Sequence, residues 1–193
     1  NAIMNLGFMT TLQFPQLETF SGSIKYGYGK DPNYQEWAPG LIDLIEMKLF
    51  WNPTDQLRVN FRLNQQKNTR PDNGGVVSSA TVPRLKVEYQ LSKSLFLRFV
   101  GQYNSSFRDS LNDSSRDGLP IYFKNSDGTF SRALKQESNN LQADFLFSYR
   151  PMPGTLIFVG YGSSLEEPER YSFSRLERRS DGFFIKLSYL YRL

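Results

Sequence analysis

The chain has 193 residues, a length that suits one domain with a sizeable core or one portion of a larger barrel. It contains no cysteine and no histidine, which excludes a disulfide framework, a thiol nucleophile, a histidine-based triad and the common zinc sites. The formal charge of +4 is spread along the chain rather than gathered into a basic block, which argues against nucleic-acid binding.

Hydropathy alone does not decide between a soluble and a membrane protein. No apolar run approaches the roughly 18 residues that a membrane-spanning helix needs. The mean hydropathy of −0.49 resembles that of a soluble protein, but a transmembrane β-barrel alternates lipid-facing and lumen-facing side chains, so its average cancels. The first six residues lack the features of a signal peptide. We therefore expect that an export signal, and the mature start or an upstream domain, lies outside this sequence.

Period-two alternation of apolar and polar side chains is the main structural signal. In residues 57–64, leucine, valine and phenylalanine alternate with arginine and asparagine. Residues 85–91, 141–150 and 183–193 alternate similarly, whereas residues 156–159 are apolar on both faces, which leaves the orientation of that strand open. A helical period would scatter these sets around a cylinder. We expect no helix of useful length and nine strands, over residues 3–13, 19–29, 40–51, 56–67, 81–91, 94–105, 139–150, 155–164 and 182–193.

The predicted connections alternate in length. Tight turns with turn-forming residues are expected at 52–55, 92–94 and 151–154. Longer polar loops are expected at 30–39, 68–80, 106–138 and 165–181. Short turns at one end and long loops at the other are typical of outer-membrane barrels, whose turns are periplasmic. The expected strand length of about 10 to 12 residues also suits a tilted membrane span.

Aromatic residues favour a membrane barrel over a soluble, lipocalin-like barrel, which would also alternate but with its apolar side inward. They gather near the two ends of the predicted strands, as expected of the belts at two membrane interfaces. The proposed interface aromatics are Trp51, Tyr103, Tyr149, Tyr161, Tyr189 and Tyr191. The chain also ends on an amphipathic strand, as outer-membrane barrels commonly do, although its last residue is leucine instead of an aromatic.

The number of predicted strands indicates whether this chain forms a complete barrel. Nine strands place the two ends of the chain on opposite sides of a membrane, whereas single-chain bacterial barrels normally have an even number and periplasmic ends. An open sheet edge is not tolerated in lipid. We therefore expect a fragment whose remaining strands lie upstream; the alternative is a count that is wrong by one strand.

Residues 148–164, Ser-Tyr-Arg-Pro-Met-Pro-Gly-Thr-Leu-Ile-Phe-Val-Gly-Tyr-Gly-Ser-Ser, resemble the C-terminal end of large bacterial outer-membrane proteins that carry an N-terminal family-9-type carbohydrate-binding sandwich. The similarity continues through residues 179–190. In that family a long barrel follows the sandwich, so the resemblance implies that this chain is the final portion of the barrel. The sandwich is absent from this sequence, and the family has no well-defined catalytic motif, so neither sugar binding nor catalysis is carried over.

Charged side chains on the polar faces of the predicted strands are the candidate lining of a lumen. They could bias a channel toward anionic or zwitterionic solutes, or they could pair across strands and simply fill or hydrate the interior. The register that would decide between these alternatives is not fixed by the sequence. The candidates are Glu46, Lys48, Arg58, Arg62, Lys86, Glu88, Arg98, Asp144, Arg150, Lys186 and Arg192.

An acidic cluster near the C-terminus is the main metal-site candidate. It comprises Glu166, Glu167, Glu169 and Asp181, lacks the spacing of a calcium loop and has four arginines close by, so a self-neutralising surface loop is favoured. No pair of carboxylates is singled out for glycosidase chemistry, and no glycine motif has the context of a phosphate loop. We expect no metal, no cofactor and no catalytic residue.

These observations predict an all-β, antiparallel up-and-down transmembrane β-barrel segment spanning residues 1–193 in a bacterial outer membrane. The leading function is a pore or transport wall for small solutes, with the 106–138 loop as gate, plug or ligand contact. One alternative is a structural anchor or surface-complex component, and another is a soluble ligand-binding barrel. The expected partners are outer-membrane lipid and other envelope proteins or an upstream domain, not nucleic acid.

Overall fold

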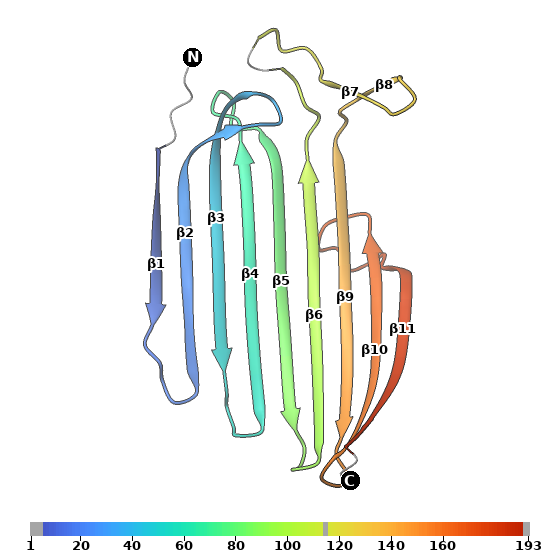
Figure 1. The fold of residues 1–193 in the computed structure, drawn as a ribbon. Helices are drawn as coiled ribbons and strands as arrows, with labels where there is room; N and C mark the ends of the chain where they lie inside the picture. Colours follow the sequence, from blue (N-terminus) through green and yellow to red (C-terminus); the bar gives the residue numbers. More distant parts are fainter. Residues whose placement is uncertain (1–5, 114–115, 191–193) are drawn as a thin grey trace.

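The computed structural model describes residues 6–113 and 116–190, which form one antiparallel sheet of nine strands in chain order (Figure 1). The sheet strands are β1 (Leu6–Phe14), β2 (Phe20–Asn33), β3 (Ala38–Trp51), β4 (Leu57–Thr69), β5 (Val76–Gln90), β6 (Leu95–Arg108), β9 (Gln136–Tyr149), β10 (Thr155–Glu167) and β11 (Glu177–Tyr189). A separate hairpin, β7 (Tyr122–Lys124) and β8 (Phe130–Arg132), lies in the connection between β6 and β9. No helix long and apolar enough to cross a membrane occurs in the described part of the chain.

All nine predicted strands are confirmed. At the short connections 15–19, 52–56, 91–94 and 150–154, their boundaries differ from the predicted ones by at most one residue. At the opposite end the strands run further than predicted, most clearly in β5, which begins at Val76 and not at residue 81. Residues 76–80 pair with β4 and β6, so tertiary pairing extends a strand where the local alternation has faded. The β7–β8 hairpin was not predicted. The predicted strand positions 3–5 and 191–193 lie outside the described residues.

The strand extensions correct two predictions. Strands range from 9 residues in β1 to 15 in β5, so several are longer than expected. The connections at the loop end shrink to residues 34–37, 70–75, 109–135 and 168–176. Only the last two are clearly longer than the turns, so the predicted contrast between turns and loops holds for the C-terminal half of the sheet and is wrong for the β2–β3 connection.

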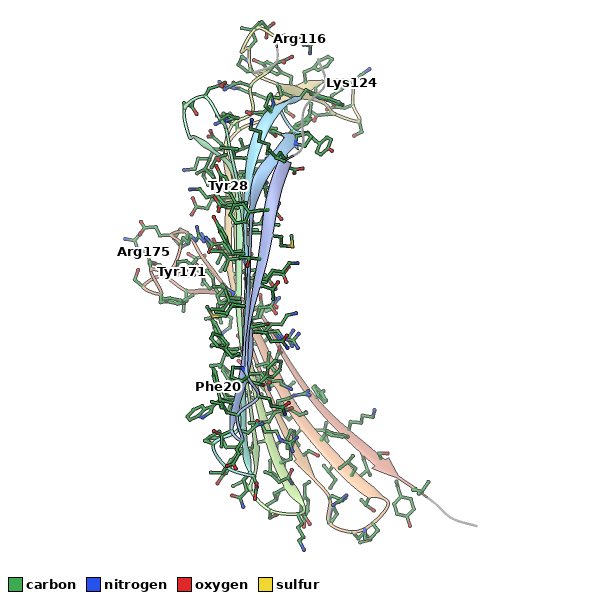
Figure 2. All side chains as sticks on the ribbon, turned by 90° about the vertical axis from the view of Figure 1, so that its left-hand side faces the viewer. Phe20, Tyr28, Arg116, Lys124, Tyr171 and Arg175 are labelled. Carbon is green, nitrogen blue, oxygen red and sulfur yellow. The ribbon has the colours of Figure 1, made fainter. Side chains whose placement is uncertain are left out.

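The sheet is a single twisted layer, not a closed barrel. β1 and β11 each pair on one side only, and Figure 2 shows the layer edge-on with no second layer against it. Buried hydrophobic residues are correspondingly few among the described residues: Ala38, Val77, Tyr103, Leu111 and Ala133. A sheet with so little apolar burial lacks the core that would stabilise it alone in water.

Candidate functional site

The register sorts the side chains of the sheet onto two faces, because residues directly opposite each other in an antiparallel pair point to the same side. One row of such partners runs without a break from β2 to β11, and every member is apolar or aromatic. This apolar row is Phe20, Trp51, Val59, Val87, Phe99, Phe145, Tyr161 and Phe183.

The face that carries the apolar row, called here the apolar face, lies open. On β11, Phe183, Ile185 and Leu187 are each about two-thirds exposed, at 66%, 66% and 67%. On β6 and β9, Leu97 and Phe145 are exposed as well. Exposed apolar residues that continue across neighbouring strands, in contrast to single scattered ones, mark a surface that contacts another protein or a membrane.

The opposite, polar face carries a second register row that crosses all nine strands. Every one of its members is polar or charged, so each strand contributes a hydrophilic side chain at the same level. This polar row is Gln13, Ser23, Lys48, Arg62, Arg84, Gln102, Gln142, Ser164 and Ser180.

Three cations stand side by side at the centre of the polar row. Lys48 lies opposite Arg62, and Arg62 lies opposite Arg84. We call these three residues the basic row. None of them forms an ion pair with another described residue, whereas the carboxylates that flank them are engaged elsewhere: Glu46 with Lys25 at 3.6 Å and Glu88 with Lys86 at 2.9 Å. The basic row is therefore a patch of uncompensated positive charge.

The basic row borders a shallow depression of about 210 Å³ on the polar face. Arg62 and Arg84 line it together with Asn60, Lys86 and Phe50. Hydrogen-bond donors thus surround a small space that has an aromatic ring at its side and no carboxylate in its lining. This chemistry suits an anion or a polar solute rather than a cation.

Most of the predicted lumen residues share this face. The register places nine of them there: Glu46, Lys48, Arg58, Arg62, Lys86, Glu88, Arg98, Asp144 and Lys186. Arg150 lies just beyond the end of β9 at Tyr149, and its guanidinium donates a hydrogen bond to the Lys93 carbonyl in the neighbouring turn, at 3.1 Å. Arg192 lies outside the described residues.

The register gives these charges two different arrangements on the polar face. Arg58, Glu88 and Arg98 are consecutive register partners of alternating sign, as expected of charges that pair across strands. The basic row has no such alternation. Sequence reasoning missed one member, Arg84, because the alternation in β5 was counted from Leu85; two residues before Lys86, Arg84 follows the same period.

The predicted interface aromatics fall into different positions. Trp51, Tyr149 and Tyr189 lie at the turn end of the apolar face. Tyr161 was expected toward the loop end but lies mid-strand, because β10 continues to Glu167. Tyr103 points to the apolar face but is buried, with only 4% of its surface exposed. Tyr191 lies outside the described residues.

A loop, residues 168–176, covers Tyr103 and stands out from one side of the sheet, where Figure 2 marks it by Tyr171 and Arg175. Tyr171 stacks on Tyr103 with ring centroids 4.8 Å apart. The buried Glu167 carboxylate accepts hydrogen bonds from the Tyr103 hydroxyl and from the backbone N–H groups of Tyr171 and Phe173, the last two at 2.9 and 2.8 Å. Glu167 therefore holds its own loop in place and is not a free surface acid.

Two other members of the acidic cluster form ion pairs with neighbouring arginines. Glu166 pairs with Arg179, and Asp181 pairs with Arg178 at 3.1 Å. Among the residues that the structure describes, no group of three or more histidine, cysteine or acidic side chains is arranged to hold a metal ion. These two ion pairs lie at the ends of β10 and β11 that border their connection.

A second network ties three connections together at the loop end of the sheet. Glu36, fully buried in the β2–β3 connection, accepts two hydrogen bonds from the Arg70 guanidinium at 2.7 and 2.9 Å. Arg70 also pairs with Asp109 at 2.9 Å, and the Asn112 N–H donates to Glu36 at 3.1 Å. The hydrogen bonds that Arg70 donates to Glu36 raise the pKa of Arg70. Burial would raise the pKa of Asp109, but Arg70 and the Ser110 N–H outweigh it and hold that pKa below its ordinary value.

The long β6–β9 connection is anchored at its base and open at its tip. Val77, Leu111 and Ala133 form a small buried cluster with Ile121 against it. Beyond this cluster the β7–β8 hairpin exposes Tyr122, Phe123 and Phe130, and Figure 2 shows Lys124 and Arg116 at the end of the molecule. The connection thus combines a fixed base with an accessible tip.

Comparisons with protein-family models, with curated proteins and with solved structures find no match to this chain. The structure itself presents a sheet with one apolar and one hydrophilic face, a basic row at the centre of the hydrophilic face and braced loops at one end.

Proposed function

We propose that this chain forms part of the wall of an outer-membrane β-barrel through which small solutes pass. The apolar face contacts lipid and the polar face lines the aqueous lumen. The observation that carries the proposal is the pair of unbroken register rows, one entirely apolar and one entirely polar, on opposite faces of one uncovered layer. A lipid-embedded barrel wall needs this division, since it has lipid on one side and water on the other.

The position of the polar side chains on the apolar face agrees with a membrane of limited thickness. Toward the loop end of that face the apolar residues give way to Thr81, Ser105 and Asn139, which are register partners in series. The 168–176 loop packs at this level, where Arg170 donates a hydrogen bond to Thr81. In the proposed orientation, the loop lies at the external interface of the membrane, outside the hydrocarbon layer.

The open edges of β1 and β11 need partners in a membrane, because unpaired backbone groups in lipid cost several kcal/mol each. We propose that further strands of the same protein close the wall, with this chain as the C-terminal portion of a barrel like those of the outer-membrane family that residues 148–164 resemble. Sequencing upstream of this chain in its gene tests that family relationship. Further strand-forming repeats, preceded by a sandwich domain, would support it.

The first experiment is membrane partitioning of the native, full-length protein, with gel mobility compared before and after boiling. A folded outer-membrane barrel should fractionate with the outer membrane, require detergent for extraction and change mobility on heating. A protein that stays soluble without detergent would overturn the proposal. In that case the hollow of about 430 Å³ on the apolar face, lined in part by Phe99, Phe145 and Tyr161, becomes the candidate ligand cavity of a soluble barrel.

The second candidate function is a membrane anchor or surface-complex component. The Glu36–Arg70–Asp109 network favours it, because the network braces the loop end and leaves Tyr34 and Trp37 exposed there, at 71% and 72%. Planar-bilayer recordings on the reconstituted full-length protein separate the two functions. Stepwise conductance supports the pore, and an inserted protein without conductance supports the anchor.

A further inference from the structure

We infer that the basic row, Lys48, Arg62 and Arg84, is a binding site for small oxyanions such as phosphate. The inference rests on the proposed function, in which this face lines the lumen. It names the class of solute that the wall holds, and it predicts that the full-length protein prefers anions.

The first argument is charge. Like charges directly opposite each other on neighbouring strands destabilise a sheet, and the basic row contains two such pairs in succession. The row continues on either side with Ser23 and Gln102, which are neutral. The flanking carboxylates Glu46 and Glu88 already have lysine partners. A bound anion would supply the compensation that the described side chains do not.

The second argument is geometry. Neighbouring strands lie about 4.8 Å apart, so Arg62 and Arg84 project from positions that one tetrahedral oxyanion can bridge. Each guanidinium presents a planar fork of donors that matches phosphate or carboxylate oxygens, and Lys48 adds a compact charge beside them. Asn60 and Lys86 extend the set of donors around the same depression.

The third argument is size. The depression beside Arg62 and Arg84 holds about 210 Å³, which suits a small oxyanion and not a large polyanion. Phosphate and sulfate share this chemistry with small carboxylates. Inorganic phosphate is therefore the probe, and chloride at equal ionic strength is the reference.

The first test uses the purified full-length protein in planar bilayers. The unmodified protein should show an anion-selective reversal potential in a potassium chloride gradient, and phosphate should reduce the chloride current. The double variant Arg62→Gln/Arg84→Gln should need at least about tenfold more phosphate for the same reduction, because two charge-assisted sites are lost. The control Lys25→Gln removes a cation from the same face that already has a carboxylate partner, and should retain the phosphate response. An unchanged response in the double variant would overturn the inference while leaving the pore intact.

The second test does not depend on conductance. In detergent, phosphate should raise the temperature at which the full-length protein loses its heat-sensitive gel mobility, relative to chloride. The double variant should lose this shift and should also be more heat-resistant than the unmodified protein in the absence of phosphate, since the like-charge contacts are removed. No phosphate shift in the unmodified protein would overturn the anion site whether or not a pore forms. Where the double variant does not fold, Arg84→Gln alone replaces it, with the same two outcomes.

Discussion

At the scale of single residues, the loop end of the sheet depends on one buried carboxylate. Glu36 accepts hydrogen bonds from Nε and Nη2 of Arg70, and the Asn33 amide at the end of β2 donates a further one at 2.9 Å. Removing one partner of such a buried pair leaves the other charge uncompensated, which is more destabilising than the pair is stabilising.

We expect Glu36→Gln to lower the free energy of opening of these connections by about 2 to 3 kcal/mol. Amide hydrogen exchange of residues 34–37 and 70–75 measures it, and protection in the middle of the strands should not change. The control is Asp72→Asn, which removes an exposed carboxylate from the same β4–β5 connection. Equal effects of the two substitutions would show that the Glu36–Arg70 pair does not brace the loops.

The same network predicts an acid transition. The folded-state pKa of Asp109 is lowered, so its contribution to stability is fully present above the unfolded value of about 3.9 and is lost as the pH falls through the folded value. Trp37 follows Glu36 directly and reports the opening by fluorescence once the other tryptophan, Trp51, is replaced by phenylalanine. The emission should be constant from neutral pH to about pH 4 and change below it. An identical change in an Asp109→Asn variant would assign the transition to another group.

Glu167 holds the 168–176 loop in place, as Glu36 does for the connections at the loop end of the sheet. Tyr171 and Phe173 adopt left-handed backbone conformations, with φ of 58° and 49°, that are unfavourable for large side chains, and the Glu167 carboxylate holds their N–H groups. Glu167→Gln replaces one acceptor oxygen by a donor, so we expect trypsin to cleave at the exposed Arg175 about ten times faster. Glu169→Gln, in the same loop and exposed, should leave the rate unchanged. Equal rates for both variants would contradict the role of Glu167.

At the scale of elements, the alternation of side chains predicts strands and faces but not everything that a strand contacts. The face of Lys48 and Arg62 follows from the period of two within their own strands. Their position opposite each other depends on the register between β3 and β4, which one strand's pattern does not contain. The like-charge pairing of Lys48 with Arg62 therefore could not be predicted from the sequence, although each residue was a candidate for the lumen lining.

Loops were harder to predict for a related reason. Glu167 lies in a run of acidic residues that is typical of an exposed loop. Nothing in the neighbouring sequence indicates that Tyr103, 64 residues earlier in the chain, donates a hydrogen bond to it. Residues 76–80 lack clear alternation, yet they extend β5 because β4 and β6 offer pairing partners. Long-range contacts thus set the features that sequence reasoning missed.

The β6–β9 connection gives a prediction at this scale. Ile121 and Ala133 are joined by a backbone hydrogen bond of 2.9 Å, so the hairpin beyond them is removable without disturbing the buried cluster at its base. Replacing residues 122–132 by a short Asn-Gly turn should leave heat-modifiable gel mobility intact and raise single-channel conductance if the hairpin restricts the pore. Unchanged conductance and unchanged solute uptake would remove this loop from the permeation pathway.

At the scale of the whole molecule, the structure is a layer that has no interior of its own. Its stability must come from the medium on each face and from partners at its edges, because few of its described side chains are buried. The assignment of lipid to the apolar face and of water to the polar face therefore decides whether the basic row lines a lumen and whether the 168–176 loop lies at a membrane interface. A lysine introduced on each face in turn tests this assignment.

Phe99 and Val100 are neighbours near the middle of the central strand β6 and point to opposite faces. Phe99 is opposite Phe145 on the apolar face, and Val100 lies between its register partners Asp144 and Lys86 on the polar face. In lipid, Phe99→Lys should lower the free energy of unfolding by about 2 to 4 kcal/mol, as a lysine does on the lipid side of a barrel near the bilayer midplane. Val100→Lys introduces the same charge on the hydrophilic side, beside one carboxylate and one ammonium group, so it should cost less than about 1 kcal/mol. Urea unfolding of the full-length protein in phospholipid vesicles measures both. If the two substitutions cost the same, neither face is distinguished by its medium, and the assignment of lipid to the apolar face fails; a large loss for Val100→Lys alone would place lipid on the opposite side.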